Sequence, residues 1–258
     1  MRSIWTGSIG FGLVNIPVKM YSATTDSSLN FDMLDKADLS NIHFRRVNAK
    51  TGREVKWNQI VKGYQVNGKY VVLSPKDFEN ASPEKSKEIK ISQFIDEEEV
   101  DSIYYEMPYY LEPEKNGIRP YELLRDSLKK TGKAGLGTFV MRNREHLVII
   151  KVSGNILVAN RIRFSEEIRK PELKIPVARS NPKELKMAIS LIDQLSGPFN
   201  IARFKDSYTA ALLKLIRNKA KGKQVQPRPL RLVHSRSMDL MDQLKASIED
   251  SGKRRKVS

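Results

Sequence analysis

Residues 3–24 read SIWTGSIGFGLVNIPVKMYSAT, and they carry the strongest indication of the fold. The stretch has no charge as far as Val18, although charged residues make up 29% of the chain. Its glycines and Pro17 interrupt any helix, and its apolar runs are too short for a membrane span of ~20 residues or for a secretory signal. Strands that bend sharply, as in barrels, combine β-branched and aromatic residues with glycines. The stretch therefore predicts two buried strands at the start of a β-barrel.

The chain has 258 residues, enough for one large domain or for one domain with an extension. Its net charge is +16, and the last 58 residues contribute +10 of it, with 15 Lys and Arg against 5 Asp and Glu. Such a surplus predicts a polyanionic partner, and nucleic acid rather than a membrane, because no lipidation motif or strongly amphipathic basic helix is present. Basic ribosomal proteins share this composition. The absence of cysteine excludes disulfides and thiolate metal sites, and it fits a cytosolic protein.

Residues 1–170 read mostly as strands, with one helix. Alternating polar and apolar residues predict a strand over 88–95, and short apolar runs predict further strands over 70–73, 139–141, 147–152 and 156–162. The turns between the last three would be 142–145 and 153–155. A helix is expected over 119–131, with Pro120 in its first turn and Gly132 as its stop. The glycines that follow, over 132–138, are out of register for a phosphate-binding loop and are interpreted as a tight connection.

From Asn181 the hydrophobic period becomes helical. Asn181 is a cap, and Glu184 completes a pattern resembling a capping box for a helix that ends before Gly197. A second helix is expected over 206–220, then a basic linker over 223–235, and a short amphipathic helix over 238–250 before the basic tail.

One cluster of basic residues lies within 18 positions, with aromatic residues between its members and Glu54 as its one acid. Its members are Arg45, Arg46, Lys50, Arg53, Lys56 and Lys62. Such side chains on an exposed loop or hairpin can follow a phosphate backbone, each releasing counterions. The alternative is a solvated strand face without a ligand.

Arg142 and Arg144 flank Asn143 at the expected hairpin tip. Two arginines there can grip phosphates on either side of a groove, or they can simply belong to an exposed turn. The lysines Lys129, Lys130 and Lys133 sit at a helix end, where they complement its negative pole.

No catalytic or metal-binding arrangement can be assembled. His43, His146 and His234 are far apart, and the acidic run over 96–99 is typical of carboxylates that point into water. We expect no metal, no cofactor and no enzyme activity. One enzymatic alternative stays open, in which a lysine attacks an abasic sugar as a lyase.

Several segments together resemble bacterial Ku, the DNA-end-binding family of non-homologous end joining. They are 3–24, 104–113, 123–133, 142–147, 183–188 and 205–223, and they follow the family's order. The resemblance implies a mainly β fold with α (α+β): a Ku-type β-barrel core, a DNA-encircling arm and a helical C-terminal region. Many bacterial Ku proteins carry paired cysteines in the arm, where this chain has residues 38–41 and 47–52 without cysteine. Any structural zinc is therefore absent.

The resemblance also implies a function. A homodimer would thread a basic ring onto double-strand DNA ends independently of sequence, protect and bridge the ends, and recruit the ATP-dependent DNA ligase D. It would be cytoplasmic in a bacterium and associated with the nucleoid. The alternatives are a basic architectural or sequence-specific dimeric DNA-binding protein, or a Ku with auxiliary abasic-site lyase activity.

The expected organisation has three parts. Residues 1–180 would form the barrel core with its arm, 181–222 would complete the core and supply the dimer contact, and 223–258 would be a basic extension. The arm cluster and the two hairpin arginines would contact DNA, with weaker contacts from the tail, Lys253, Arg254, Arg255 and Lys256. The last amphipathic helix would meet the ligase or pack on its own core, through Leu240, Met241, Leu244 and Ile248.

Overall fold

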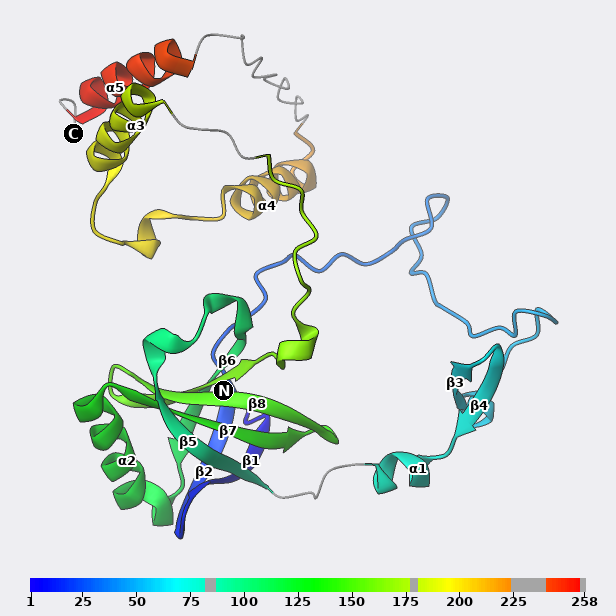
Figure 1. Cartoon of the computed structure of the whole chain (residues 1–258). Helices are drawn as coiled ribbons and strands as arrows, with labels where there is room; N and C mark the ends of the chain where they lie inside the picture. Colours follow the sequence, from blue (N-terminus) through cyan, green and yellow to red (C-terminus); the bar gives the residue numbers. More distant parts are fainter. Residues whose placement is uncertain (82–86, 177–180, 224–239, 256–258) are drawn as a thin grey trace. The chain divides into compact units, whose positions relative to one another are not determined.

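The computed structural model of the chain describes residues 1–81, 87–176, 181–223 and 240–255 (Figure 1). Two compact units divide the chain. The first comprises Met1–Asp26 and Asn30–Pro171, and the second comprises Ser27–Leu29 and Glu172–Ser258. Among the described residues, no helix is long and apolar enough to cross a membrane.

A closed seven-stranded barrel forms the centre of the first unit. Its strands, in the order in which they pair, are β1 (Trp5–Phe11), β2 (Val14–Ser22), β6 (Tyr105–Pro113), β9 (Ile156–Ile162), β8 (Arg144–Ser153), β7 (Lys133–Met141) and β5 (Glu88–Asp96). Only the β1–β5 pair, which closes the barrel, is parallel. Gly12 turns β1 into β2 with φ of 57°, in the left-handed region that glycine adopts without strain. The two strands expected in residues 3–24 are thus confirmed.

Strand β7 is longer than its sequence indicates. We expected a glycine connection over 132–138, but β7 begins at Lys133 and this part of the prediction is wrong. Its glycines are needed because β7 runs against β5: a Cβ on Gly137 would lie 2.1 Å from the carbonyl oxygen of Lys90, and one on Gly135 would lie 2.9 Å from Ile91. At Gly137 the neighbour is backbone, so a side chain is excluded there, whereas at Gly135 the Ile91 side chain would have to shift. With glycine at both positions, the strand lacks the apolar alternation by which strands are recognised.

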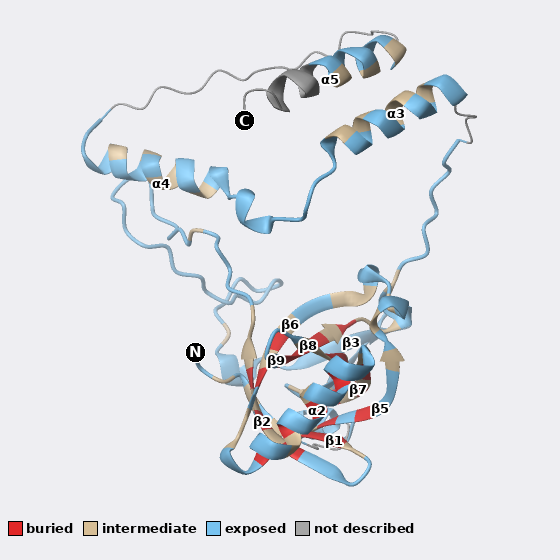
Figure 2. Ribbon diagram, turned by 90° about the vertical axis from the view of Figure 1, so that its left-hand side faces the viewer, coloured by how far each residue is buried: buried red, intermediate tan, exposed pale blue. Residues whose placement is uncertain are grey.

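The barrel interior is packed with apolar side chains and covered by helix α2 (Ile118–Thr131). Figure 2 shows the buried residues on the strands and on one face of α2. Tyr121 of α2 is buried, and its hydroxyl donates to the carbonyl oxygen of Leu111 and accepts from the amide of Leu157, both at 2.7 Å. One phenol therefore ties the helix to β6 and β9. The helix ends at Gly132 with φ of 68°, as predicted.

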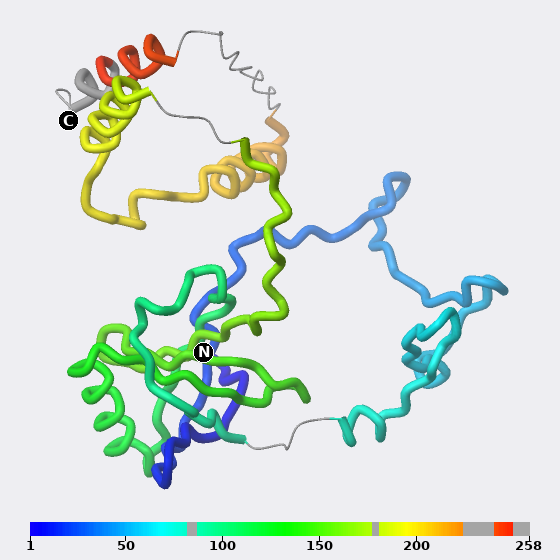
Figure 3. Tube along the Cα trace, viewed as in Figure 1, coloured from blue at the N-terminus to red at the C-terminus, as the bar shows by residue number. Residues whose placement is uncertain are grey.

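Residues 23–81 contribute no strand to the barrel and are called the arm here (Figure 3). The arm contains a two-stranded sheet of β3 (Lys62–Val66) and β4 (Lys69–Leu73), followed by the short helix α1 (Pro75–Asn80). Asn67 and Gly68 both have positive φ, 48° and 79°, which is the two-residue turn that matches strand twist. β4 confirms the strand predicted over 70–73, whereas β3 was not predicted.

The second unit contains the helices α3 (Pro182–Leu195), α4 (Ser207–Ala220) and α5 (Leu240–Arg255). The side-chain oxygen of Asn181 accepts from the amide of Lys183 at 3.0 Å, so the predicted cap is confirmed. α5 lies beside α3 (Figures 1 and 2), and Gln194 donates to the carbonyl oxygen of Ile248 at 3.3 Å. α5 also runs on through Gly252, beyond the expected end at 250. No side chain described in this unit is buried.

Candidate nucleic-acid interface

The basic cluster of the arm is fully accessible. All six of its members, Arg45, Arg46, Lys50, Arg53, Lys56 and Lys62, are exposed. Among the described residues Arg45 is the one member with an ion pair, to Glu54 at 3.6 Å, and both of these side chains face solvent. Because an exposed pair of this kind contributes little, the cluster keeps nearly its full positive charge available.

Side chains close the turns of the arm. The Oδ1 atom of Asn48 accepts from the amides of Lys50 and Thr51 at 2.9 and 3.0 Å. Asp38 accepts from the amide of Ser40 at 3.0 Å, and this hydrogen bond lowers the pKa of the Asp38 carboxyl. The segments without cysteine are therefore ordered by local hydrogen bonds to the backbone.

Two aromatic rings hold cationic groups of the arm. The guanidinium of Arg46 lies 4.7 Å from the ring centroid of Trp57, and the ammonium of Lys62 lies 4.9 Å from that of Phe78. The indole of Trp57 is 73% exposed. Stacking of this kind orients a cation while leaving its outer side accessible to a phosphate.

The second predicted group is at the tip of the β7–β8 hairpin. Arg142 and Asn143 form its two-residue turn with positive φ of 53° and 63°, and Arg144 is the first residue of β8. Both arginine side chains are exposed. The predicted hairpin is confirmed, but its turn is shorter than the predicted 142–145, because Arg144 and Glu145 already pair with β7. The hairpin tip carries two exposed cations.

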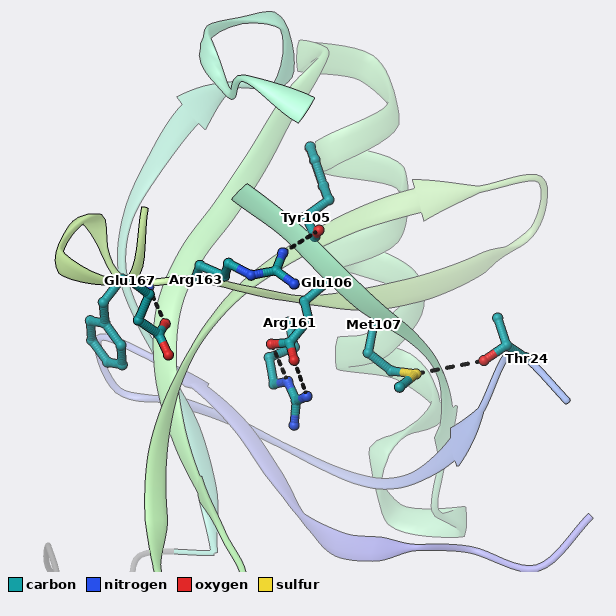
Figure 4. Close-up of polar contacts among 8 residues, drawn as sticks. Thr24, Tyr105, Glu106, Met107, Arg161, Arg163 and Glu167 are labelled. Carbon is teal, nitrogen blue, oxygen red and sulfur yellow. Dashed lines mark hydrogen bonds and ion pairs between the residues drawn. The ribbon is translucent and has the colours of Figure 1, made fainter. Parts of the chain in front are cut away.

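A further pair of arginines, missed by the sequence analysis, lies at the end of β9. Arg161 forms two hydrogen bonds with Glu106, and Nη1 of Arg163 donates to the carbonyl oxygen of Tyr105 at 3.0 Å (Figure 4). The same close-up shows Thr24, at the start of the arm, donating to the sulfur of Met107 at 3.6 Å. Arg161 and Arg163 lie on either side of Ile162, and a barrel strand presents every second residue to the same face. This pattern could have predicted that the two arginines share one face.

Arg161 and Glu106 both affect the pKa of His146 in β8. Partial burial lowers its pKa, and the positive charge of Arg161 lowers it further, while Glu106 opposes both. The imidazole therefore stays neutral to lower pH than a free histidine.

The acidic run over 96–99 is partly neutralised by lysines. Asp96 pairs with Lys133 at 2.7 Å, and Glu97 pairs with Lys151. In the described part of the chain, no three His, Asp or Glu side chains gather as metal ligands would.

The C-terminal candidates are described in part. Lys253, Arg254 and Arg255 lie on the backbone of α5, but their side chains are outside the described set, and Lys256 lies outside the described residues. Leu240 is exposed, whereas Met241, Leu244 and Ile248 are half-buried.

Comparison with known proteins gives a consistent result. The model of the Ku70/Ku80 beta-barrel domain matches residues 10–187. The protein named "Non-homologous end joining protein Ku" in Opitutus terrae is 41% identical over 260 residues, which cover 98% of this chain and 93% of the relative. Proteins of the same name in Archaeoglobus fulgidus and Bacillus subtilis are 38% and 36% identical, over 96% of this chain and 99% and 82% of their own lengths. With a closed barrel of the expected type and relatives that match along nearly the whole chain, this protein belongs to the Ku family.

Proposed function

We propose that this protein binds double-strand DNA ends in non-homologous end joining, as a homodimer that encircles the duplex. The proposal rests on the exposed positive charge of the arm and of the hairpin tip. The chain that carries this charge belongs to the Ku family. Phosphate contacts of this kind hold a duplex without reading its bases. The proposed contacts are Arg45, Arg46, Lys50, Arg53, Lys56, Lys62, Arg142 and Arg144, with weaker ones from the tail, Lys253, Arg254, Arg255 and Lys256.

The composition of the arm supports a ring. Its β3–β4 sheet has two strands, and apolar side chains such as Tyr64, Val71 and Val72 are exposed on it. A two-stranded sheet of this kind is at best marginally stable in water. A surface that covers its apolar side chains would therefore stabilise it. Two arms related by a two-fold axis would cover each other and close around the duplex.

Apolar residues of the second unit support a dimer contact. Leu185, Ile189 and Ile192 lie at helical spacing on α3, and all three are exposed. We assign this contact to 181–222 and the barrel with its arm to 1–180. The extension over 223–258 would recruit the ATP-dependent DNA ligase D through Leu240, Met241, Leu244 and Ile248.

The mechanism needs no chemical step by the protein. A ring confined to a free end protects that end, and two rings that meet hold two ends together for the ligase. The role places the protein with the chromosome, in the bacterial cytoplasm.

Retention on linear and circular DNA tests the proposal. A linear duplex should bind, a covalently closed circle of the same sequence should not, and bulky caps added to both ends should abolish loading. Equal retention on the circle would favour an architectural or sequence-specific DNA-binding protein. Sedimentation of the protein–DNA complex gives the second test, because it measures the oligomeric state of the bound protein. A bound monomer would exclude the ring.

A further inference from the structure

A cavity of about 570 Å³ lies beside the start of α2, among residues of β2, β6 and the β8–β9 turn. Its volume is in the ~300–1,000 Å³ range of small-ligand sites. Three tyrosines are among the residues that line it: Tyr21 of β2 and Tyr110 of β6 are half-buried, and Tyr121 of α2 is buried. Ile118 and Ile156 also line it, and both are exposed. The cavity therefore combines aromatic walls with an apolar rim.

Two carboxylates contribute to the lining of this cavity. Glu112 and Glu122 line it, together with Arg125. The Arg125 guanidinium already donates through Nε to Asp126 at 2.9 Å and through Nη1 to the carbonyl oxygen of Asn155 at 3.4 Å. Two carboxylates thus line the cavity, and Arg125 among the lining residues already has partners for its guanidinium. Met1 also lines the cavity, and its side chain is exposed.

Hydrogen bonding fixes part of the wall before any ligand enters. The Tyr21 hydroxyl donates to Glu112 at 2.6 Å, and the Tyr121 hydroxyl is held between two backbone groups. Glu112 keeps its second oxygen as an acceptor, and both oxygens of Glu122 are acceptors. The rings need little reordering, which lowers the entropy lost on binding.

We infer that this cavity binds an arginine side chain of a partner protein, presented on a short segment with apolar neighbours. A guanidinium is planar, stacks on tyrosine rings and donates to carboxylates in pairs, whereas a lysine ammonium is a strongly hydrated point charge. Ile118 and Ile156 would receive the neighbouring apolar residues. This site goes beyond the proposed DNA-end binding and does not depend on it.

Its position leaves the DNA surface free. Strand β8 runs from Arg144 at the hairpin tip to Ser153 next to the β8–β9 turn, and its 10 residues span about 33 Å. The cavity and the two hairpin arginines are therefore at opposite ends of one strand. The protein can therefore bind a partner in the cavity and a duplex at the hairpin tip at the same time.

Fluorescence anisotropy on the full-length protein tests the inference. The probe is a short labelled peptide with one arginine between leucines and prolines, and matched peptides carry lysine or glutamate at that position. The arginine peptide should bind saturably, the lysine peptide severalfold more weakly, and the glutamate peptide not at all. Glu122→Lys should weaken the arginine peptide about tenfold. Glu99→Lys makes the same charge change at an exposed glutamate outside the cavity and should leave binding unchanged.

Two further measurements keep the result clear. Circular dichroism and retention on linear DNA should be the same for Glu122→Lys and for the unmodified protein, so that a loss of peptide binding is not a loss of fold. Ile118→Ser removes an apolar contact on the rim of the cavity without adding a charge, and this second variant should also weaken binding of the arginine peptide. Absence of saturable binding to the unmodified protein, or equal binding to both glutamate variants, would overturn the site whatever the outcome for DNA.

Discussion

Arg161 donates two hydrogen bonds to Glu106, from Nε to Oε2 at 2.9 Å and from Nη2 to Oε1 at 2.6 Å (Figure 4). The pair connects β9 and β6 at an irregularity in their pairing. Tyr105 pairs with Ile162 and Met107 pairs with the adjacent residue, Arg161, so Glu106 has no partner in the register. Glu106 is the extra residue of this bulge. The side chains are only 18% and 33% exposed, so the pair holds the irregular point of the barrel in a partly desolvated setting.

Replacing Glu106 with glutamine should lower the free energy of unfolding by about 1 kcal/mol at pH 7, allowing for the screening of a partly exposed pair. The Arg161 hydrogen bond lowers the pKa of Glu106 in the folded state below the ordinary value of 4.5. A lowered folded pKa stabilises the fold above that value, and this contribution is lost as the pH falls through the folded pKa. Urea unfolding at neutral and acidic pH should therefore show the difference between the two proteins fading in acid. Glu99→Gln, at an exposed site, should leave the free energy of unfolding unchanged at both pH values. If the destabilisation by Glu106→Gln stayed undiminished in acid, the assignment would be contradicted.

The double change Arg142→Ala and Arg144→Ala should weaken DNA binding and flatten its salt dependence. If both arginines neutralise phosphates, the slope of log K against log salt should become shallower by about 1.8, or roughly 0.9 per contact. Titrations of a linear duplex at several salt concentrations measure this. The control, Lys115→Ala with Arg119→Ala, removes the same charge from exposed residues near the start of α2. An equal change in slope for both double variants would show that only net charge matters.

Trp57 should report duplex binding by the arm. Its ring is exposed and lies under the guanidinium of Arg46, whereas Trp5 is half-buried and donates from Nε1 to the carbonyl oxygen of Val140 at 3.1 Å. Linear duplex should reduce acrylamide quenching of tryptophan emission, because DNA would shield the exposed ring. In Trp57→Phe the residual emission should not respond. A full response in that variant would place the contact away from the arm.

Gly137→Ala should destabilise the barrel by about 1–3 kcal/mol, since the new Cβ would overlap the Lys90 carbonyl oxygen at 2.1 Å. Gly197→Ala is the matched change at a glycine with open space around it and an ordinary φ, and it should stay within about 0.5 kcal/mol. Thermal unfolding of the two variants compares them directly. Similar melting temperatures would mean that β5 can move away from β7.

Much of the fold could be predicted because its signals are local. The β1–β2 hairpin, the α2 helix with its glycine stop, the β7–β8 hairpin with its turn predicted at 142–145, and the Asn181 cap each depend on a few neighbouring residues. β3 was missed even though Asn67-Gly68 is a strong turn signal, because its own five residues are all exposed and carry no buried face. The DNA candidates of the arm and hairpin could likewise be found by charge alone.

The amino-acid order by itself indicated strands at the start of a barrel, a basic cluster and a helical C-terminal part, since turn chemistry, hydrophobic period and charge act over short distances. The arm was expected only from the resemblance to Ku. Tertiary structure alone decided that Gly137 belongs to a strand, that Arg161 meets Glu106, and that three tyrosines and two glutamates line one cavity. Each of these brings together residues far apart in the chain. Which strands become neighbours depends on the closure of the whole barrel, and no local pattern encodes that register.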